Sequence, residues 1–357
     1  MIVELKFLMT CNPGTEDVVA MEVLEEIPGA RIIEAREGSG RVRVEAPEHP
    51  GVVERMLGLR SVHSIVLLLA EDSIGFDAGS LARIHDIVSS SSVEDVISRF
   101  QTFAVEAERI GEGHEYTSMD IARVVGDAVI RVVEARRGWR PEVRLNSPQV
   151  ILYAGVEFDR FSLGVLVSGE RSLHVKRYRL YDHPAALKST LAYVMLRLSN
   201  ARDGDVIVDP MCGGGTIAME AALLYENSKI ICMDLNPRFL KGALTNFIVA
   251  RVERRIKVVV GDARRLTDYT GVESVDRIVT NPPYGIRMGE LEEVRETIRE
   301  FLGEALKALK PGGTLTIITP DRGYVISKAR EAGFELQHAR NVRHGDLLAS
   351  IIVLGRG

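Results

Sequence analysis

The second half of the chain alternates between short apolar runs and helical patterns, and this alternation constrains the fold more than any other feature. From residue 183 onward, the expected strands are 206–208, 230–233, 256–260, 275–280 and 314–319, and the expected helices are 216–224, 239–250, 292–309 and 324–332. Such alternation is typical of a doubly wound sheet with parallel strands. Two further strand patterns, 334–339 and 347–354, follow without a helix between them, so one should run antiparallel. We predict an α/β domain over residues 183–357.

The first half of the chain has a different order of elements. Residues 1–70 read as strand, helix, strand, strand, helix, strand, which is the order of a ferredoxin-like unit. An acidic loop at Glu71–Ser73 then leads into helical patterns at 81–88, 93–100 and 118–137 and strand patterns at 102–107, 150–158 and 161–167. We therefore expect a ferredoxin-like domain (1–70), a second α+β domain (71–170) and a linker (171–182).

Composition limits the classes of function. The formal net charge is −5, whereas a nucleic-acid binder usually has a basic excess, so only local basic patches could serve that role. The longest uncharged aliphatic run, Ile65–Ala70, is far shorter than the roughly 20 residues of a membrane helix. The three cysteines lack C-x-x-C spacing, so neither a disulfide nor a zinc site is expected. We expect a cytoplasmic monomer that needs no metal and no membrane.

A glycine-rich segment, Asp209–Thr216, lies between an expected strand and an expected helix. In open α/β sheets this is where ligands bind, because glycines allow close approach and the helix N-terminus offers unpaired N–H groups. A tight strand-to-helix turn is the alternative. No G-x-x-x-x-G-K-[ST] sequence occurs, which disfavours a nucleoside triphosphate loop.

Acidic residues close the first three strands of this domain. Asp234 follows Gly213 by 21 residues, a spacing at which a carboxylate can accept both ribose hydroxyls of a nucleoside. Asp262 closes the next strand. Either residue alone would more often be an N-cap or a turn residue. Together with Asp209 and the glycine loop, they predict a cradle for one nucleoside.

The fourth strand ends in Asn281-Pro282-Pro283-Tyr284-Gly285. This looks like the [Asp/Asn]-Pro-Pro-[Tyr/Phe] motif of S-adenosylmethionine-dependent amino methyltransferases, which act on exocyclic amines of bases or on amide nitrogens. In such a loop, the Asn281 oxygen and the Pro282 carbonyl would accept the two hydrogens of the amine. Tyr284 would stack on the planar substrate. A rigid Pro-Pro turn is the structural alternative.

Residues 183–357 as a whole resemble the class I methyltransferase fold. The resemblance implies S-adenosyl-L-methionine as cofactor and Asn281, Pro282 and Tyr284 as catalytic residues. The segment 183–188 is similar to one that closes over the cofactor in related RNA methyltransferases. The implied cofactor-binding residues are Leu187, Asp209, Cys212, Gly213, Gly215, Thr216, Asp234, Leu235, Asp262, Ala263 and Asn281.

The order of the three parts resembles the THUMP-domain RNA-modifying enzymes, in which the front half grips tRNA. Within that family the combination is most similar to the guanosine-N2 methyltransferases that modify guanosine 6 of the tRNA acceptor stem. Arginines with interleaved aromatics suit phosphates and bases, although a solvated helix end has the same composition. The candidate RNA-binding residues are Arg136, Arg137, Arg140, Lys176, Arg177, Arg179 and Arg287.

Several other functions fit the same motif. The target could be another guanosine in tRNA or ribosomal RNA, a DNA adenine, or a glutamine amide in a protein. The α+β front half and the basic linker disfavour a protein target. A further alternative is a non-catalytic RNA-binding protein, which the acids at 209, 234 and 262 and Asn281 argue against.

Overall fold

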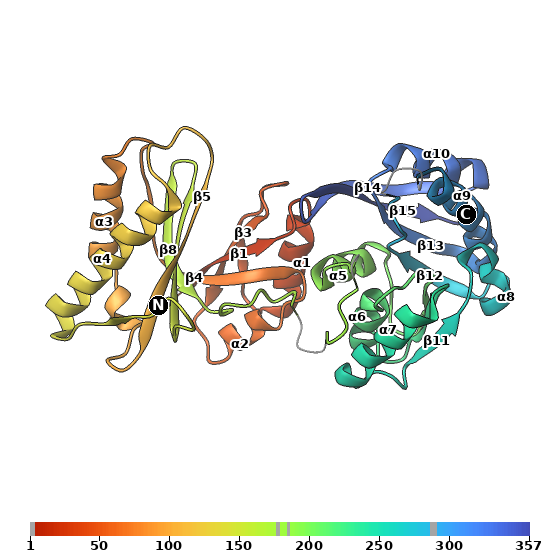
Figure 1. The fold of residues 1–357 in the computed structure, drawn as a ribbon, viewed down its shortest axis with the longest axis horizontal. Coiled ribbons are helices and arrows are strands. Elements are labelled where there is room, and N and C mark those ends of the chain that lie inside the picture. Colours follow the sequence, from red (N-terminus) through yellow and green to blue (C-terminus); the bar gives the residue numbers. More distant parts are fainter. Residues whose placement is uncertain (1–3, 176–178, 184–185, 286–290) are drawn as a thin grey trace. The chain divides into compact units, whose positions relative to one another are not determined.

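The computed structural model describes residues 4–175, 179–183, 186–285 and 291–357 and divides the chain into two compact units (Figure 1). The first unit holds residues up to 10, 20–35 and 41–173. The second holds residues 11–19, 36–40 and 174–357. The four domain boundaries expected from the sequence stay a prediction.

The first unit is built on an eight-stranded sheet with strand order β2-β3-β1-β4-β8-β7-β5-β6. Its strands are β1 (Glu4–Cys11), β2 (Arg31–Glu34), β3 (Arg41–Pro47), β4 (Val62–Ser73), β5 (Thr102–Ile110), β6 (Glu142–Val143), β7 (Val150–Glu157) and β8 (Arg160–Leu166). Its helices are α1 (Glu16–Glu26), α2 (Val52–Leu57), α3 (Ser80–Ser90), the short 3₁₀ helix η1 (Val93–Asp95) and α4 (Ser118–Arg137). The βαββαβ order expected over the first 70 residues is confirmed.

Two local expectations for this unit were wrong. The acidic segment 71–73 is not a loop but the end of β4, where it pairs with β8. Glu71 is tolerated in the sheet because its carboxylate accepts hydrogen bonds from Arg43 Nε (3.1 Å) and Ser162 Oγ (2.7 Å). The helical pattern at 93–100 forms only the single turn η1, since helix nucleation is costly for so short a segment.

The longest helix of the first unit, α4, follows directly from its sequence. Thr117 and Asp120 form a reciprocal capping box at its start, and Gly138 ends it in the left-handed conformation with φ 76°. The apolar stripe that includes Ile121, Val125 and Val129 is fully buried in the core of this unit.

The second unit is built on a seven-stranded sheet with strand order β11-β10-β9-β12-β13-β15-β14. Its strands are β9 (Val206–Asp209), β10 (Lys229–Asp234), β11 (Ile256–Val260), β12 (Val275–Thr280), β13 (Leu309–Thr319), β14 (Glu335–His344) and β15 (Leu347–Gly355). Its helices are α5 (Ser189–Leu198), α6 (Thr216–Leu224), α7 (Pro237–Ala250), the 3₁₀ turn η2 (Ala263–Arg265), α8 (Leu266–Thr270), α9 (Leu291–Ala308) and α10 (Arg322–Ala332). Strands β9 to β13 pair in parallel, and β15 is antiparallel to both its neighbours, which confirms the predicted doubly wound fold.

Two apolar clusters pack against this sheet. One gathers α5, α6 and α7 around residues such as Met219 and Phe247, and the other gathers α8, α9 and α10 around residues such as Phe301 and Leu315. Helix α5 was not predicted. Eight of its ten residues are buried, so it has no polar face to give the periodic pattern of a surface helix. The parallel strands, whose carboxyl ends carry the candidate site residues, are thus held between buried apolar side chains of the helices.

The second unit also includes a segment from the beginning of the chain, residues 11–19. The Asn12 side chain donates to the Arg343 carbonyl (2.8 Å) and accepts from Thr190 Oγ1 (2.9 Å), while the Arg343 amide donates to the Pro13 carbonyl (3.1 Å). Val18 belongs to the apolar cluster around α5. The second unit is therefore not one continuous stretch of sequence.

Among residues 4–175, 179–183, 186–285 and 291–357, no helix is long and apolar enough to cross a membrane. The same residues contain no group of three or more His, Cys, Asp or Glu side chains that could hold a metal ion.

Candidate active site

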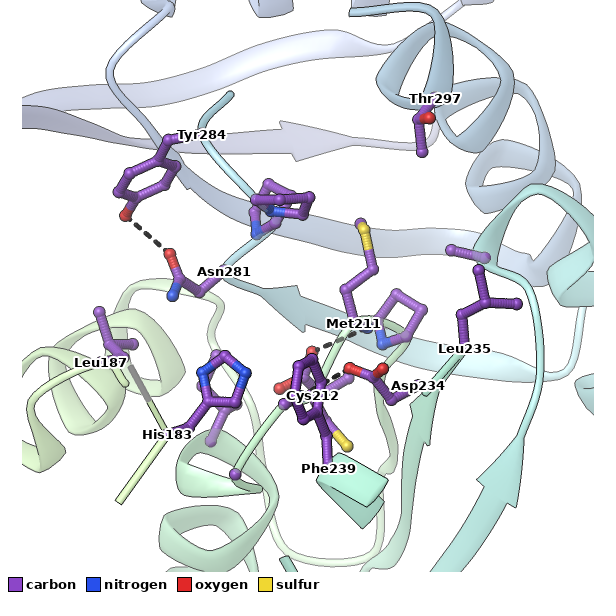
Figure 2. A pocket seen from close by; sticks show the side chains of 18 of the residues that line it. His183, Leu187, Met211, Cys212, Asp234, Leu235, Phe239, Asn281, Tyr284 and Thr297 are labelled. Atoms are coloured by element: carbon purple, nitrogen blue, oxygen red, sulfur yellow. Dashed lines mark hydrogen bonds between the residues drawn. The ribbon is translucent and has the colours of Figure 1, made fainter. Parts of the chain in front are cut away.

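A cavity of about 670 Å³ opens at the carboxyl ends of the parallel strands of the second unit (Figure 2). It is lined by twelve of the residues that the sequence singled out: Leu187, Asp209, Cys212, Gly213, Thr216, Asp234, Leu235, Asp262, Ala263, Asn281, Pro282 and Tyr284. Eleven of these residues come from the ends of β9, β10, β11 and β12 and from the segments that follow them, whereas Leu187 lies just before α5. The structure thus brings the glycine loop, the strand-end acids and the Asn-Pro-Pro-Tyr segment to one site.

The glycine loop depends on backbone conformations that favour glycine. Gly213 and Gly215 have φ angles of 48° and 77°. Gly215 does not line the cavity: it stands immediately before α6, and a Cβ there would lie 2.5 Å from the Phe247 ring. Gly215 therefore allows α6 and α7 to pack closely, whereas Gly213 faces the cavity.

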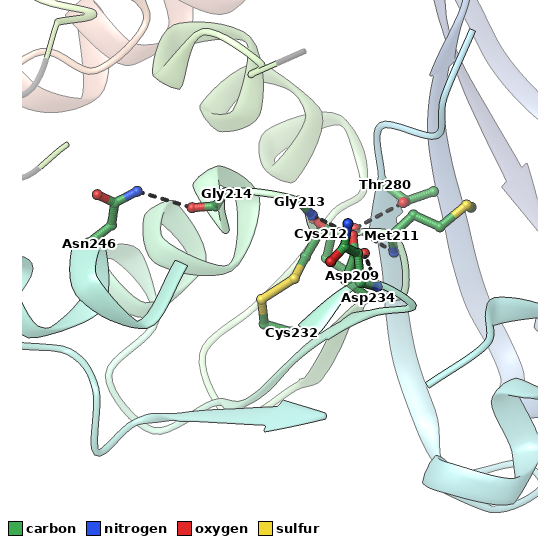
Figure 3. The surroundings of a disulfide bond; sticks show 10 residues. Asp209, Met211, Cys212, Gly213, Gly214, Cys232, Asp234, Asn246 and Thr280 are labelled. Atoms are coloured by element: carbon green, nitrogen blue, oxygen red, sulfur yellow. Dashed lines mark hydrogen bonds between the residues drawn. A yellow bond between two sulfur atoms is a disulfide. The ribbon is translucent and has the colours of Figure 1, made fainter. Parts of the chain in front are cut away.

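Cys212 and Cys232 form a disulfide with a Cα–Cα distance of 5.6 Å (Figure 3), so the expectation of no disulfide was wrong. Cys232 lies on β10 and is paired in register with Asp209 of β9, which brings the loop after β9 beside it. The 20-residue separation carries no local signal, because only the pairing of β9 with β10 brings the two cysteines together. The bond ties the cavity wall to β10, the strand next to the edge of the sheet.

Asp209 is almost fully buried at the end of β9. Its Oδ1 accepts hydrogen bonds from Thr280 Oγ1 (2.9 Å) and from the Met211 amide (3.3 Å). Burial raises the pKa of Asp209 to about 7, because the surrounding protein solvates the carboxylate poorly, and the nearby Asp234 carboxylate adds to the rise. Asp209 links the ends of β9 and β12 and sets the position of the loop between them.

The other two strand-end acids are oriented by their own loops. Asp234 accepts from the Gly213 amide through Oδ2 (2.9 Å) and from the Asn236 amide through Oδ1 (2.8 Å), which fixes its carboxylate against the glycine loop. Asp262 forms a two-pronged ion pair with Arg264, and the hydrogen bond from this arginine lowers the pKa of Asp262. Each carboxylate oxygen has two lone pairs, so Asp234, which accepts one hydrogen bond on each oxygen, keeps acceptor capacity toward the cavity. Both oxygens of Asp262 are already engaged by the backbone amide and the guanidinium of Arg264.

Asn281 and Tyr284 contact each other in the loop after β12. The Tyr284 hydroxyl donates a hydrogen bond to Asn281 Oδ1 (2.7 Å), as Figure 2 shows. Burial raises the pKa of Tyr284, so this hydroxyl stays protonated as a donor at neutral pH. The tyrosine thereby fixes the asparagine oxygen in one orientation, a role that the sequence did not indicate.

Other residues of the cavity wall were not among the individual site residues expected from the sequence, although His183 and Met211 belong to the segments 183–188 and 209–216 discussed above. His183 packs edge-on against the Phe239 ring at 4.3 Å between centroids (Figure 2). A Cβ built at Gly213 would lie 3.6 Å from the His183 ring, so the ring stands close to the glycine loop. Burial lowers the pKa of His183. Met211 and Thr297 also line the cavity. Phe239 is a single aromatic residue on α7, and nothing in the sequence marks it as part of the cavity. His183 is the first residue of the segment 183–188, which the resemblance suggested would close over the cofactor.

The candidate RNA-binding residues of α4 and its end form local contacts with acids. Arg136 binds the Glu94 carboxylate (2.9 Å) and two backbone carbonyls, Arg137 pairs with Asp95, and Arg140 pairs with Glu134 (2.8 Å). These pairs offset part of their positive charge.

Of the remaining basic candidates, Arg179 contacts the wall of the cavity. Arg179 donates to Thr216 Oγ1 (2.6 Å) and to the Leu187 carbonyl (2.7 Å), so it holds together two segments of the cavity wall. Lys176, Arg177 and Arg287 lie outside the described residues. RNA contact by any of these seven residues stays a prediction.

Comparison with known proteins agrees with this geometry. An RMKL-like methyltransferase domain model matches residues 176–350, and a THUMP domain model matches residues 79–166. A methyltransferase complexed with S-adenosylhomocysteine shares the fold, with a TM-score of 0.79 at 19% identity over 99% of this chain and 98% of that one. The fold and the matched domains define a class I methyltransferase with a THUMP domain in front of it.

Relatives of similar length narrow the class further. The tRNA (guanine(6)-N2)-methyltransferase of Archaeoglobus fulgidus is 32% identical over 98% of this chain and 92% of its own length, and that of Thermus thermophilus is 34% identical over 97% and 98%. The crystal structure of TrmN from Thermus thermophilus superposes with a TM-score of 0.83 at 31% identity, covering 99% of this chain and all of that one. The chain belongs to the tRNA (guanine(6)-N2)-methyltransferase family. Membership of a methyltransferase family implies S-adenosylmethionine as methyl donor.

Proposed function

We propose that this protein transfers a methyl group from S-adenosylmethionine to the exocyclic 2-amino group of a guanosine in tRNA, at position 6 of the acceptor stem. The observation that carries this proposal is the near full-length similarity to tRNA (guanine(6)-N2)-methyltransferases. The hydrogen-bonded pair Asn281–Tyr284 at the cavity supports it, because this pair presents an acceptor for an amine. We further propose that the enzyme acts in the cytoplasm as a monomer.

The cavity residues fit the cofactor. Asp234 is already oriented by two backbone amides and can accept from ribose hydroxyls. Leu235 is 67% exposed beside it and offers an apolar surface for a planar base. At Gly214 a Cβ would lie 3.2 Å from the His183 side chain, so the loop has little room for a larger residue. S-adenosylmethionine, when bound, would supply an activated methyl group on a sulfonium sulfur.

The chain's own groups would orient the amine. Asn281 Oδ1 and the Pro282 carbonyl would accept its two hydrogens, which directs the nitrogen lone pair toward the cavity. The Tyr284 hydroxyl holds the Asn281 amide in place, and a carbonyl oxygen has a second lone pair with which to accept from the substrate. Orientation of this kind stabilises the transition state without a covalent intermediate.

The replacement Asn281→Ala tests this assignment. We expect turnover to fall by about 10²-fold or more, by analogy with the loss of one orienting hydrogen bond in other active sites, while the cofactor dissociation constant stays within about twofold. Asn281→Asp keeps an acceptor and should retain part of the activity. Asn227→Ala, at a surface asparagine bonded to Asp203, serves as the control. Wild-type turnover by Asn281→Ala would refute the mechanism.

A further inference from the structure

A second cavity of about 280 Å³ shares the Asn-Pro-Pro-Tyr segment with the first. Pro282, Pro283, Tyr284 and Val294 line both cavities. The rest of the second cavity comes from α9, from the end of β13 and from the start of α10: Leu291, Arg295, Ile298, Thr319, Pro320, Asp321, Tyr324 and Val325. A planar group whose edge reaches the tetrapeptide could therefore extend into this second cavity.

Most residues that line this cavity are aliphatic, proline or tyrosine, but the lining also includes one ion pair, Arg295–Asp321. Arg295 donates through Nε to Asp321 Oδ2 (2.9 Å) and through Nη1 to Glu292 (3.0 Å), and its Nη2 lies 2.8 Å from the same Asp321 oxygen in the ion pair. Its guanidinium lies 5.0 Å from the centre of the Tyr324 ring, whose hydroxyl donates to the Arg295 carbonyl (2.9 Å). These contacts hold the Arg295–Asp321 pair in a fixed orientation.

The pair keeps hydrogen-bonding capacity. In the described parts of the chain, no hydrogen bond reaches Asp321 Oδ1, so this oxygen is an available acceptor. Arg295 has five N–H donors, of which its two hydrogen bonds use two, and the ion-pair contact of Nη2 engages that nitrogen as well. Both side chains are about one-third exposed, at 33% and 31%, and a ligand in the cavity can reach them. The cavity thus offers one donor and one acceptor side by side.

We propose that this cavity selects guanine: Asp321 Oδ1 accepts from guanine N1–H, and Arg295 donates to guanine O6. The inference rests on the proposed function. In guanine the 2-amino group, N1–H and O6 follow one another along one edge of the ring. A guanine whose amine reaches Asn281 therefore has an adjacent donor and an acceptor to place against the Arg295–Asp321 pair.

The same pair disfavours other occupants. Adenine has an acceptor at N1 and a donor at N6, which would face the Asp321 carboxylate and the Arg295 guanidinium with the wrong polarity. A phosphate would be attracted by Arg295 but repelled by Asp321, with which Arg295 is already paired. A base with the hydrogen-bonding edge of guanine satisfies both side chains at once.

The test uses two tRNA substrates that differ only at position 6, which carries either guanosine or 2-aminopurine. The 2-aminopurine base keeps the amine that accepts the methyl group but lacks O6 and has an acceptor at N1. For the full-length wild-type enzyme we expect kcat/KM to be about 10²-fold higher on guanosine. In Asp321→Asn, whose amide can donate to N1 of 2-aminopurine, this preference should fall to less than about tenfold.

Two further variants complete the experiment. Asp321→Ala should also lose the preference, and cofactor titration of each variant checks that the second unit remains folded. Asp268→Asn, at an exposed ion pair with Arg265 outside both cavities, should keep the wild-type preference. If the wild-type enzyme methylates both tRNAs equally, or if Asp321→Asn keeps the 10²-fold preference, the guanine-selecting cavity is refuted. If the wild-type enzyme methylates neither tRNA, the proposed function itself fails.

Discussion

Replacing Asp209 with asparagine should change how the stability of the second unit depends on pH. Burial raises the pKa of Asp209 to about 7, well above the ordinary aspartate pKa of about 4. Because a pKa difference of one corresponds to about 1.4 kcal/mol, complete ionisation of this buried carboxyl lowers the free energy of unfolding by about 4 kcal/mol. Asparagine keeps an oxygen that can accept from Thr280 and from the Met211 amide but carries no charge.

The sign follows from proton binding. Because the folded-state pKa is raised, the native state holds the proton more tightly than the unfolded chain. The contribution of Asp209 to stability is therefore present below about pH 4 and is lost as the pH rises to about 7. Of the full loss, about 3 kcal/mol should develop between pH 5 and pH 8.

Pulse proteolysis in a urea series can measure this for the wild type and for Asp209→Asn, with the fragments of the second unit as the readout. The free energy of unfolding of the variant, relative to that of the wild type, should rise by about 3 kcal/mol from pH 5 to pH 8. A difference between the two proteins that stays constant over this range would mean that Asp209 is not held in its neutral form by burial.

Two other perturbations test the cavity wall. Asp234→Ala should weaken S-adenosylmethionine binding by about 10- to 100-fold in calorimetric titration, since a charge-assisted pair of hydrogen bonds contributes about 1.5 to 3 kcal/mol, and an unchanged dissociation constant would contradict its assignment to the ribose. The double replacement of Cys212 and Cys232 by serine should lower the melting temperature, because a disulfide that closes a loop of this length stabilises the fold by about 3 kcal/mol. Calorimetry of the wild type should likewise show a lower melting temperature with reductant than without it. Equal melting temperatures in the two conditions would mean that the disulfide does not stabilise the protein.

The site was largely predictable because its residues stand at the carboxyl ends of strands. Asp209, Asp234 and Asn281 each close an apolar run, and parallel strands bring such ends to one edge of the sheet. The hydrogen bond from Tyr284 to Asn281 was not predictable in the same way, because it depends on side-chain conformations within one loop.

What the sequence could not indicate depends on tertiary contacts. Helix α5 is buried nearly all round, so its sequence lacks a periodic polar face. The Cys212–Cys232 bond and the Arg295–Asp321 pair join residues 20 and 26 positions apart, and no local pattern marks either of them. The placement of segment 11–19 in the second unit likewise follows from contacts such as Asn12 with Arg343.

The most direct test of the central claim is to identify the methylated nucleoside and its position. An unmodified tRNA transcript with guanosine at position 6 is incubated with the enzyme and S-adenosylmethionine, digested with a ribonuclease and analysed by mass spectrometry. We expect N2-methylguanosine in the fragment that contains position 6, and no methylation when that position is adenosine. Methylation at a different nucleotide, methylation of an adenine amino group, or no methyl transfer to tRNA would contradict it.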